Sequence, residues 1–221
     1  MVLRLKQAGL TQRVIRAIQR TAMTTTLAPK TEFAAARKAM LDSQLRTSGV
    51  NEPFVLERMG TVAREEFVPE SLRGVAYSDR AVRLGDGKVL PQPLFHGMML
   101  SEAQPLASDE VLVIDGGSGY LPALVEPMVK SVRVMTPEDA AGGRKKGAFS
   151  LVLVDGAIEH VPAALAKLVA DGGRIVTGLV ERNVTRLATG RKTAGALALL
   201  PLAELGVPRL AQFDRPTSWS F

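Results

Sequence analysis

Two patterns of hydrophobic residues divide the chain near Pro105. After this residue, short apolar runs alternate with helical segments and turns, which is typical of strands buried on both faces of a sheet. The predicted strands are residues 111–114, 132–135, 149–154 and 174–177. The predicted helices between them are residues 121–130 and 161–169. This strand–helix order predicts an α/β fold with a doubly wound, mostly parallel sheet.

The part of the chain before Pro105 has a helical and then an irregular pattern. Apolar spacing predicts a helix over residues 32–48 and a second helix that Asn51 caps. Residues 64–87 are rich in turn-forming residues and are expected to be irregular, and a short helix is expected after Pro93. A helical region is therefore expected to precede the sheet.

These patterns divide the chain into three regions. They are a basic amphipathic segment with its linker (1–31), a helical region with a loop (32–105), and a sheet domain (106–221). Within the last region, residues 184–199 alternate enough for a hairpin that turns at Gly190 or Gly195.

The positive charge of the chain lies almost entirely at its start. The 221 residues carry a net charge of +6, and residues 1–22 contain five basic residues and no acidic one. The remaining chain carries 23 basic and 22 acidic residues. A role in nucleic-acid binding is therefore not expected of the body of the protein.

The segment 1–22 also has an apolar stripe, with Leu10, Val14 and Ile18 four residues apart. Such a helix can extend the first domain, lie on an anionic membrane or dock on a partner, and a targeting peptide looks similar. Another interpretation is that translation begins at Met23. These alternatives remain open.

Several kinds of site are excluded by composition. The chain has no cysteine and only two histidines, so disulfides, thiolate metal sites and a histidine-rich metal centre are not expected. No apolar run reaches the roughly 20 residues of a membrane span. The sequence therefore predicts a soluble, cytoplasmic protein without a metal.

The main chemical signal is the glycine-rich turn after the strand at 111–114. Glycines allow a ligand to approach the backbone closely, and the following helix start exposes N–H groups. Asp155 ends another strand, so we expect it at the same edge of the sheet. A Gly-Gly-x-Gly sequence also fits a tight turn with no ligand, and it matches neither G-x-G-x-x-G nor a phosphate-binding loop.

Several further segments contain motifs that point to the same protein family. They are residues 40–49 (ending Q-L-x-x-x-G), 55–59, 64–69 (R-E-x-F-V-P), 76–79 (A-Y-x-D), 117–120 (G-S-G-Y), 155–157 with 161–162, and 168–176 (ending G-G-R-I-V). Together they resemble the protein-L-isoaspartate O-methyltransferase family, one of the class I S-adenosylmethionine-dependent methyltransferases. The resemblance covers about residues 36–200.

The resemblance implies a Rossmann-like fold that binds S-adenosylmethionine at the carboxyl ends of the strands. It implies transfer of a methyl group to the α-carboxylate of isoaspartyl residues in a protein or peptide substrate, which begins the repair of damaged proteins. The cofactor residues it implies are Asp115, Gly116, Gly117, Ser118, Gly119, Tyr120, Asp155 and Gly156. The substrate-loop candidates are Tyr77, Asp79, Gln92 and His96. No catalytic residue is assigned, because an ionised carboxylate is already a nucleophile and mainly needs alignment.

The sequence departs from the family in three places. Val113 stands where the family has an acid, and Asp115 replaces the first glycine of the turn. Pro91 replaces the serine of the family's substrate loop. Residues 121–148 are too few for the usual elements, so we expect the sheet to lack one strand and its helices. At the position where the family has an acidic residue that binds ribose, this chain has Thr136, and Glu138 is close to it in sequence.

Two functions follow from these observations. One is an O-methyltransferase that acts on isoaspartyl residues. The alternative is a non-catalytic relative that keeps the fold as a binding or assembly module. The shortened segment 121–148 leaves cofactor binding open, and peripheral membrane contact through residues 1–22 is a further possibility.

Overall fold

The computed structural model describes residues 31–143 and 147–215, so the segment 1–22 and Met23 lie outside the described residues. Residues 31–39 are helical and belong to a unit of their own. Met40 begins the second unit, which holds the sheet. Within the described ranges, no helix is long and apolar enough to cross a membrane. The predicted boundary between residues 105 and 106 stays a prediction.

Short helices open the second unit. The helix predicted over 32–48 is confirmed, but its end changes to a π-helical turn, η1 (Leu41–Leu45), and a 3-10 turn, η2 (Arg46–Ser48). Helix α2 (Pro53–Thr61) follows. The predicted cap at Asn51 is wrong, because Glu52 is the N-cap residue. Pro53 explains the shift, since a proline favours extended backbone at the residue before it and fits the first turn of a helix.

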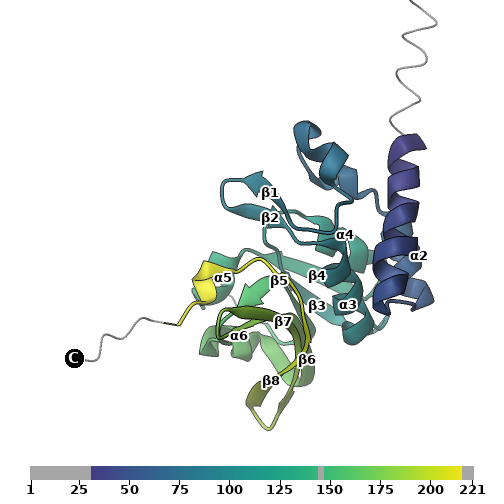
Figure 1. The fold of residues 1–221 in the computed structure, drawn as a ribbon. Helices are drawn as coiled ribbons and strands as arrows, with labels where there is room; N and C mark the ends of the chain where they lie inside the picture. Colours follow the sequence, from purple (N-terminus) through teal and green to yellow (C-terminus); the bar gives the residue numbers. More distant parts are fainter. Residues whose placement is uncertain (1–30, 144–146, 216–221) are drawn as a thin grey trace, which may run out of the picture. The chain divides into compact units, whose positions relative to one another are not determined.

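Residues 64–90 are more ordered than the sequence predicted. They form two 3-10 helices, η3 (Arg64–Phe67) and η4 (Glu70–Val75), and an antiparallel hairpin of β1 (Val82–Gly85) and β2 (Lys88–Leu90). This hairpin forms a separate two-stranded sheet (Figure 1). Strands of three or four residues offer too few alternating positions for the pattern to be recognised. The predicted helix after Pro93 is confirmed as α3 (Pro93–Ala103).

The main sheet has six strands in the order β4-β3-β5-β6-β7-β8. The strands are β3 (Glu110–Ile114), β4 (Ser131–Met135), β5 (Phe149–Ile158), β6 (Val169–Glu181), β7 (Val184–Thr193) and β8 (Ala196–Glu204). The first four in sheet order are parallel, and β7 and β8 add antiparallel pairs. The predicted α/β sheet is therefore confirmed, with a hairpin that turns at Gly195.

Helices connect the parallel strands. They are α4 (Tyr120–Val125), η5 (Glu126–Met128), α5 (Pro137–Ala141) and α6 (Ala163–Leu168), and the turn η6 (Ala211–Phe213) follows β8. The described residues between β4 and β5 contain α5 and no strand. Strand β4 is consequently at an edge of the sheet, as the short segment 121–148 suggested.

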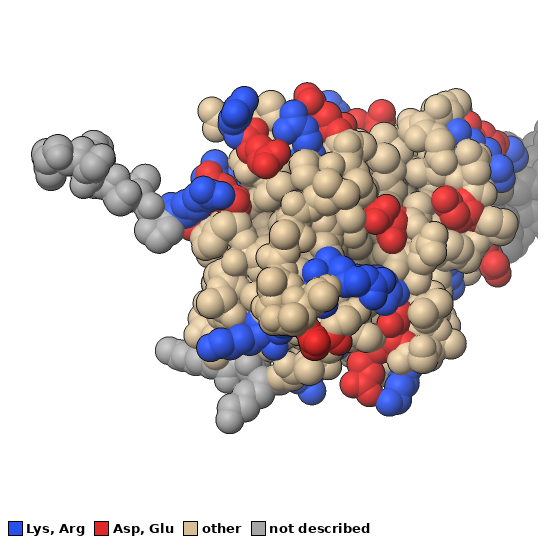
Figure 2. Space-filling model, turned by 90° about the horizontal axis from the view of Figure 1, so that it is seen from below, with Lys and Arg blue, Asp and Glu red and all other residues tan. Residues whose placement is uncertain are grey.

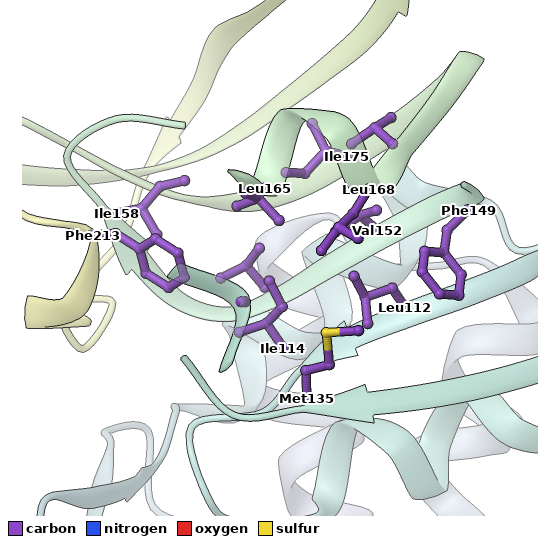
Figure 3. Packing of buried hydrophobic residues seen from close by; sticks show 13 residues of the cluster. Leu112, Ile114, Met135, Phe149, Val152, Ile158, Leu165, Leu168, Ile175 and Phe213 are labelled. Carbon is purple, nitrogen blue, oxygen red and sulfur yellow. The ribbon is translucent and has the colours of Figure 1, made fainter. Parts of the chain in front are cut away.

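Alternate residues of the central strands pack on opposite faces of the sheet. On one face, a buried cluster contacts α5, α6 and η6 (Figure 3). It includes Leu112 and Ile114 from β3, Val152 and Val154 from β5, Ile175 from β6, and Phe213 from η6. On the other face, α3 packs against β6 and β7. The middle of the sheet is thus covered on both sides, which explains the uninterrupted apolar run of β3.

Arg174 of β6 ties the ends of three elements together. Its Nη2 and Nη1 lie 2.6 and 3.2 Å from the two carboxylate oxygens of Asp109, before β3. Its Nε donates to the Ala103 carbonyl of α3 at 2.8 Å. Burial raises the pKa of Asp109, but the Arg174 contact and other hydrogen bonds outweigh it and hold that pKa below 3.8. The pair therefore stabilises the fold at neutral pH and loses this contribution as the pH falls through the lowered pKa.

Strand β8 forms the other edge of the sheet, and its outward face is apolar. Leu200 and Leu202 are exposed on it, while Leu197 and Leu199 pack against the buried cluster. Pro201 lies between the two exposed leucines. The edge therefore combines exposed apolar side chains with a residue that has no N–H to donate.

Basic and acidic side chains are interspersed on the face of the molecule that Figure 2 shows. Figure 2 shows one face, where lysine, arginine, aspartate and glutamate side chains lie singly or in small groups among larger areas without charge. This mixed surface agrees with a body whose basic and acidic residues nearly balance.

Substitution Leu112→Ala removes a fully buried side chain from the cluster, and we expect it to lower the free energy of unfolding by about 2–5 kcal/mol. The control, Leu202→Ala, truncates the same kind of side chain on the exposed face of β8, and we expect a change within about 0.5 kcal/mol. Denaturant unfolding measures both. Equal effects would contradict the assignment of the core.

Candidate functional site

The glycine turn follows β3 and is closed by its own side chains. Both carboxylate oxygens of Asp115 accept from the backbone N–H of Gly119, at 3.2 and 3.1 Å. The hydroxyl of Ser118 accepts from the Tyr120 N–H at 3.2 Å. The Asp115 N–H donates to the Met135 carbonyl at 3.0 Å, which joins the turn to the end of β4. The turn is therefore held in one shape from within.

Lys88 of the β1–β2 hairpin lies over this turn. Gly117 has a φ of 100°, and a Cβ added there would lie 2.6 Å from Cγ of Lys88. The Val89 N–H donates to the Gly116 carbonyl at 3.4 Å. Glycine is required at Gly117 both by its left-handed backbone and by this close approach. Sequence reasoning missed Lys88, because no signal connects the hairpin with the turn.

A cavity of about 360 Å³ opens beside the turn, at the carboxyl ends of β3 and β4. It is lined by Asp86, Gly87, Lys88, Asp115, Gly116, Gly117, Thr136, Pro137, Glu138, Arg209, Leu210, Ala211 and Gln212. It brings the turn together with Glu138, which the sequence placed near the position of the ribose acid. The Glu138 carboxylate also accepts from the Gln212 amide at 2.6 Å, a contact that sequence spacing gave no reason to expect.

Asp115 belongs both to the turn and to the lining of the cavity. Burial raises the pKa of Asp115 above its ordinary value, and the charge of Asp155 raises it further. Hydrogen bonds from the Gly119 and Gly117 N–H groups act in the opposite direction. A carboxylate in these surroundings is stabilised by a cationic ligand.

Asp155 is fully buried and belongs to a chain of polar contacts. Its Oδ1 lies 2.7 Å from His96 Nε2, and the other ring nitrogen of His96 lies 3.3 Å from Nη1 of Arg64. Since arginine can only donate, we assign Nδ1 of His96 as the acceptor and Nε2 as the nitrogen that carries the proton. Arg64 and Asp155 are thereby linked through one imidazole, and all three side chains have no exposed surface or almost none.

Arg64 also organises the segments around it. Its Nε donates to the Ala76 carbonyl at 2.7 Å, and its Nη2 donates to the Pro91 carbonyl. The guanidinium carbon lies 4.9 Å from the centre of the Tyr120 ring. Burial lowers the pKa of Arg64, although Tyr120 and Asp155 oppose this effect. Pro91 thus contributes its backbone oxygen to this network.

Aromatic rings complete the wall next to Arg64. The Tyr120 ring packs edge-on against Phe67 and His96, with centroids 5.3 and 5.2 Å apart. The Tyr77 hydroxyl accepts from the Arg64 N–H at 3.2 Å and donates to Glu65. The contacts of Tyr77 and Tyr120 thus surround Arg64. They hold Arg64 in place.

The predicted site residues fall into separate groups. Asp115, Gly116 and Gly117 line the cavity, while Ser118 and Gly119 close the turn. Four belong to the buried network and its wall: Tyr77, His96, Tyr120 and Asp155. Gly156 is covered by the Leu210 side chain, Gln92 precedes the first turn of α3, and Asp79 is exposed before β1.

No cluster of metal-binding side chains accompanies the cavity. In residues 31–143 and 147–215, no group of three or more histidine, aspartate or glutamate side chains lies close enough to hold a metal ion.

Comparison with known proteins gives the family. The model of the protein-L-isoaspartate(D-aspartate) O-methyltransferase family matches residues 35–140. A protein-L-isoaspartate O-methyltransferase of Koribacter versatilis (strain Ellin345) is 31% identical over 192 residues, covering 76% of this chain and 86% of the relative. The chain belongs to the protein-L-isoaspartate O-methyltransferase family.

Other members show the same relation. The enzyme of that name from Roseiflexus castenholzii (strain DSM 13941 / HLO8) is 30% identical over 191 residues, covering 75% of this chain and 87% of the relative. The crystal structure of a putative family member from Plasmodium falciparum, in complex with S-adenosyl-L-homocysteine, has a TM-score of 0.64 at 16% identity. It covers 80% of this chain and 98% of that chain, and it supports the family fold.

Gly117→Ala tests the contact between the turn and the hairpin. We expect it to displace Lys88 and to destabilise the protein by more than the roughly 1–2 kcal/mol of a left-handed alanine. Gly195→Ala is the control, since Gly195 has a φ of 80° but nothing within 4 Å of the added carbon. Unfolding free energies compare the two. If Gly117→Ala cost no more than Gly195→Ala, the close packing of Lys88 would be disproved.

His96→Leu tests the buried network. The substitution leaves Arg64 and Asp155 buried without their shared partner, so we expect a loss of about 3–5 kcal/mol of unfolding free energy. Asp155→Asn keeps a polar group beside the imidazole, so we expect a smaller loss of unfolding free energy. Thermal and denaturant unfolding measure both variants. A nearly neutral His96→Leu would show that the three side chains do not act together.

Proposed function

We propose that this chain is an S-adenosylmethionine-dependent methyltransferase that transfers a methyl group to the carboxylate of isoaspartyl residues in proteins or peptides. The observation that carries the proposal is the cavity that joins the glycine turn to the end of β4. Ligands of open α/β sheets bind at this position, outside the carboxyl ends of the strands. Membership in the family supplies the chemistry, because its relatives carry the name of that reaction.

The residues around the cavity fit the cofactor. A volume of about 360 Å³ lies within the range of small-molecule sites, which is roughly 300–1,000 Å³. S-adenosylmethionine carries a sulfonium and an ammonium group, and the lining supplies the carboxylates of Asp115 and Glu138. The lining also includes Asp86 and two cationic residues, Lys88 and Arg209. Arg209 is already paired with Glu159 and Asp214. The short segment 121–148 therefore still leaves a cavity with suitable size and charge.

Each part of the lining has a distinct task in this proposal. Gly116 and Gly117 allow close approach to the backbone, and Asp115 provides negative charge for a cationic ligand. Glu138, held by Gln212, offers an acceptor for ribose hydroxyls. When bound, the cofactor supplies an activated methyl group. The protein aligns this group with the substrate carboxylate and excludes water.

The buried network has a positioning task. His96 and Asp155 have no exposed side-chain surface, so neither can contact a substrate in this structure. Their contacts hold α3, the end of β5 and the segment from Arg64 in register with the turn. A carboxylate acceptor is ionised near neutral pH, which is why transfer needs no histidine base. A cytoplasmic location is part of the proposal and rests on the cysteine-free sequence, which suits a reducing compartment.

The decisive experiment uses the full chain and two peptides. Calorimetric titration with S-adenosylmethionine should give saturable binding, and a peptide with one isoaspartyl residue should accept a methyl group. The matched peptide with an ordinary aspartyl residue should not. No heat at millimolar cofactor and no methyl transfer would overturn the proposal and would instead favour a non-catalytic binding module.

Asp115→Asn gives the same experiment a residue-level test. Loss of the carboxylate should weaken cofactor binding about tenfold or more, the size of a hydrogen bond to a charged group. Because burial raises the pKa of Asp115, the ionised form destabilises the fold above that pKa, so Asn should raise the melting temperature at neutral pH. The control is Asp139→Asn, which removes an exposed carboxylate next to Glu138 but outside the lining. Unchanged affinity in Asp115→Asn would remove this residue from the site.

A further inference from the structure

A second cavity, of about 530 Å³, adjoins the candidate cofactor cavity. It lies between the β1–β2 hairpin and the segment 206–209. Its lining is Ala81, Arg83, Gly85, Gly87, Lys88, Val89, Gly206, Val207, Pro208 and Arg209. Gly87, Lys88 and Arg209 also line the first cavity, so the two spaces are neighbours. We call the second cavity the hairpin cleft.

The charged residues that line the hairpin cleft are all basic. They are Arg83, Lys88 and Arg209. Arg209 is compensated, since its guanidinium lies 2.7 Å from both Glu159 and Asp214. Arg83 and Lys88 are exposed and form no ion pair with the other described residues. The positive charge that faces the cleft therefore comes from these two side chains.

The remaining lining suits an extended polypeptide. Glycines at Gly85, Gly87 and Gly206 keep side chains out of the space, and Val89, Val207 and Pro208 give it apolar walls. Carbon atoms of Lys88 pack over Gly117, so one end of the cleft meets the glycine turn. A chain lying in the cleft can thus bring one residue to the turn while its neighbours lie beside Arg83.

We propose that the hairpin cleft holds the polypeptide substrate and favours isoaspartyl residues that are flanked by acidic residues. The proposal rests on the proposed methyltransferase function and adds to it a specificity and a residue, Arg83, that determines it. Uncompensated cations beside a cleft without acidic lining attract acidic segments, and they affect binding more than the reaction step.

The test compares two synthetic peptides that each contain one isoaspartyl residue. One carries aspartate and glutamate on both sides of it, and the other carries asparagine and glutamine at the same positions. The unaltered protein should have a lower KM for the acidic peptide, with similar kcat for both. Added salt should reduce the difference, because the cations are exposed to solvent.

Variants at Arg83 locate the effect. Arg83→Gln should raise the KM for the acidic peptide by about two- to fivefold, the size that an exposed ion pair supports. Arg83→Glu should raise it further, and neither should change kcat or the KM for the neutral peptide. The controls, Arg73→Gln and Arg73→Glu, make the same charge changes on η4 at an exposed residue that does not line the cleft.

The outcomes separate this proposal from the function itself. If both peptides are methylated with equal KM, or if Arg73 and Arg83 variants behave alike, the cleft does not select acidic substrates although the enzyme is active. If neither peptide is methylated and S-adenosylmethionine does not bind, the proposed function fails first. A change in kcat without a change in KM would place Arg83 in a different role and would also overturn the proposal.

Discussion

The buried contacts from Arg64 through His96 to Asp155 join parts of the chain that lie far apart in sequence. Arg64 is at the start of η3, His96 is in α3 and Asp155 is near the end of β5. Burying a charged pair is costly unless both members are hydrogen-bonded. Here the neutral imidazole of His96 donates to Asp155 and accepts from Arg64. The position of the glycine turn depends on this arrangement, since the Tyr120 ring at its end packs on both His96 and Arg64.

The same network explains how two carboxylates can share one edge of the sheet. Burial makes ionisation of Asp115 less favourable, and the charge of Asp155 raises the pKa of Asp115 further. Asp155 is bound by His96 on one side and faces the Ser118 hydroxyl at 3.5 Å on the other. Asp155 is therefore engaged in the buried network, while Asp115 lines the cavity together with Asp86 and Glu138.

Local sequence predicted the sheet well and the site incompletely. Apolar runs such as that of β3 identified the parallel strands, because burial on both faces leaves few polar positions. The β1–β2 hairpin was not predicted, because its strands are short. Its contact with the turn joins Lys88 to Gly117, which are far apart in sequence. His96 was assigned to the substrate loop from its place in the sequence, whereas its buried partners depend on long-range packing. Leu210 over Gly156 and Gln212 beside Glu138 come from a segment far along the chain, and no spacing rule connects them.

The outward face of β8 has a consequence for behaviour at high concentration. An edge strand with exposed leucines offers a template on which a strand of another molecule can add, which is how many proteins aggregate. Pro201 interrupts this template, because a strand that approaches there finds no N–H donor. The molecule can thus keep Leu200 and Leu202 at its surface while resisting the growth of its sheet from one copy to the next.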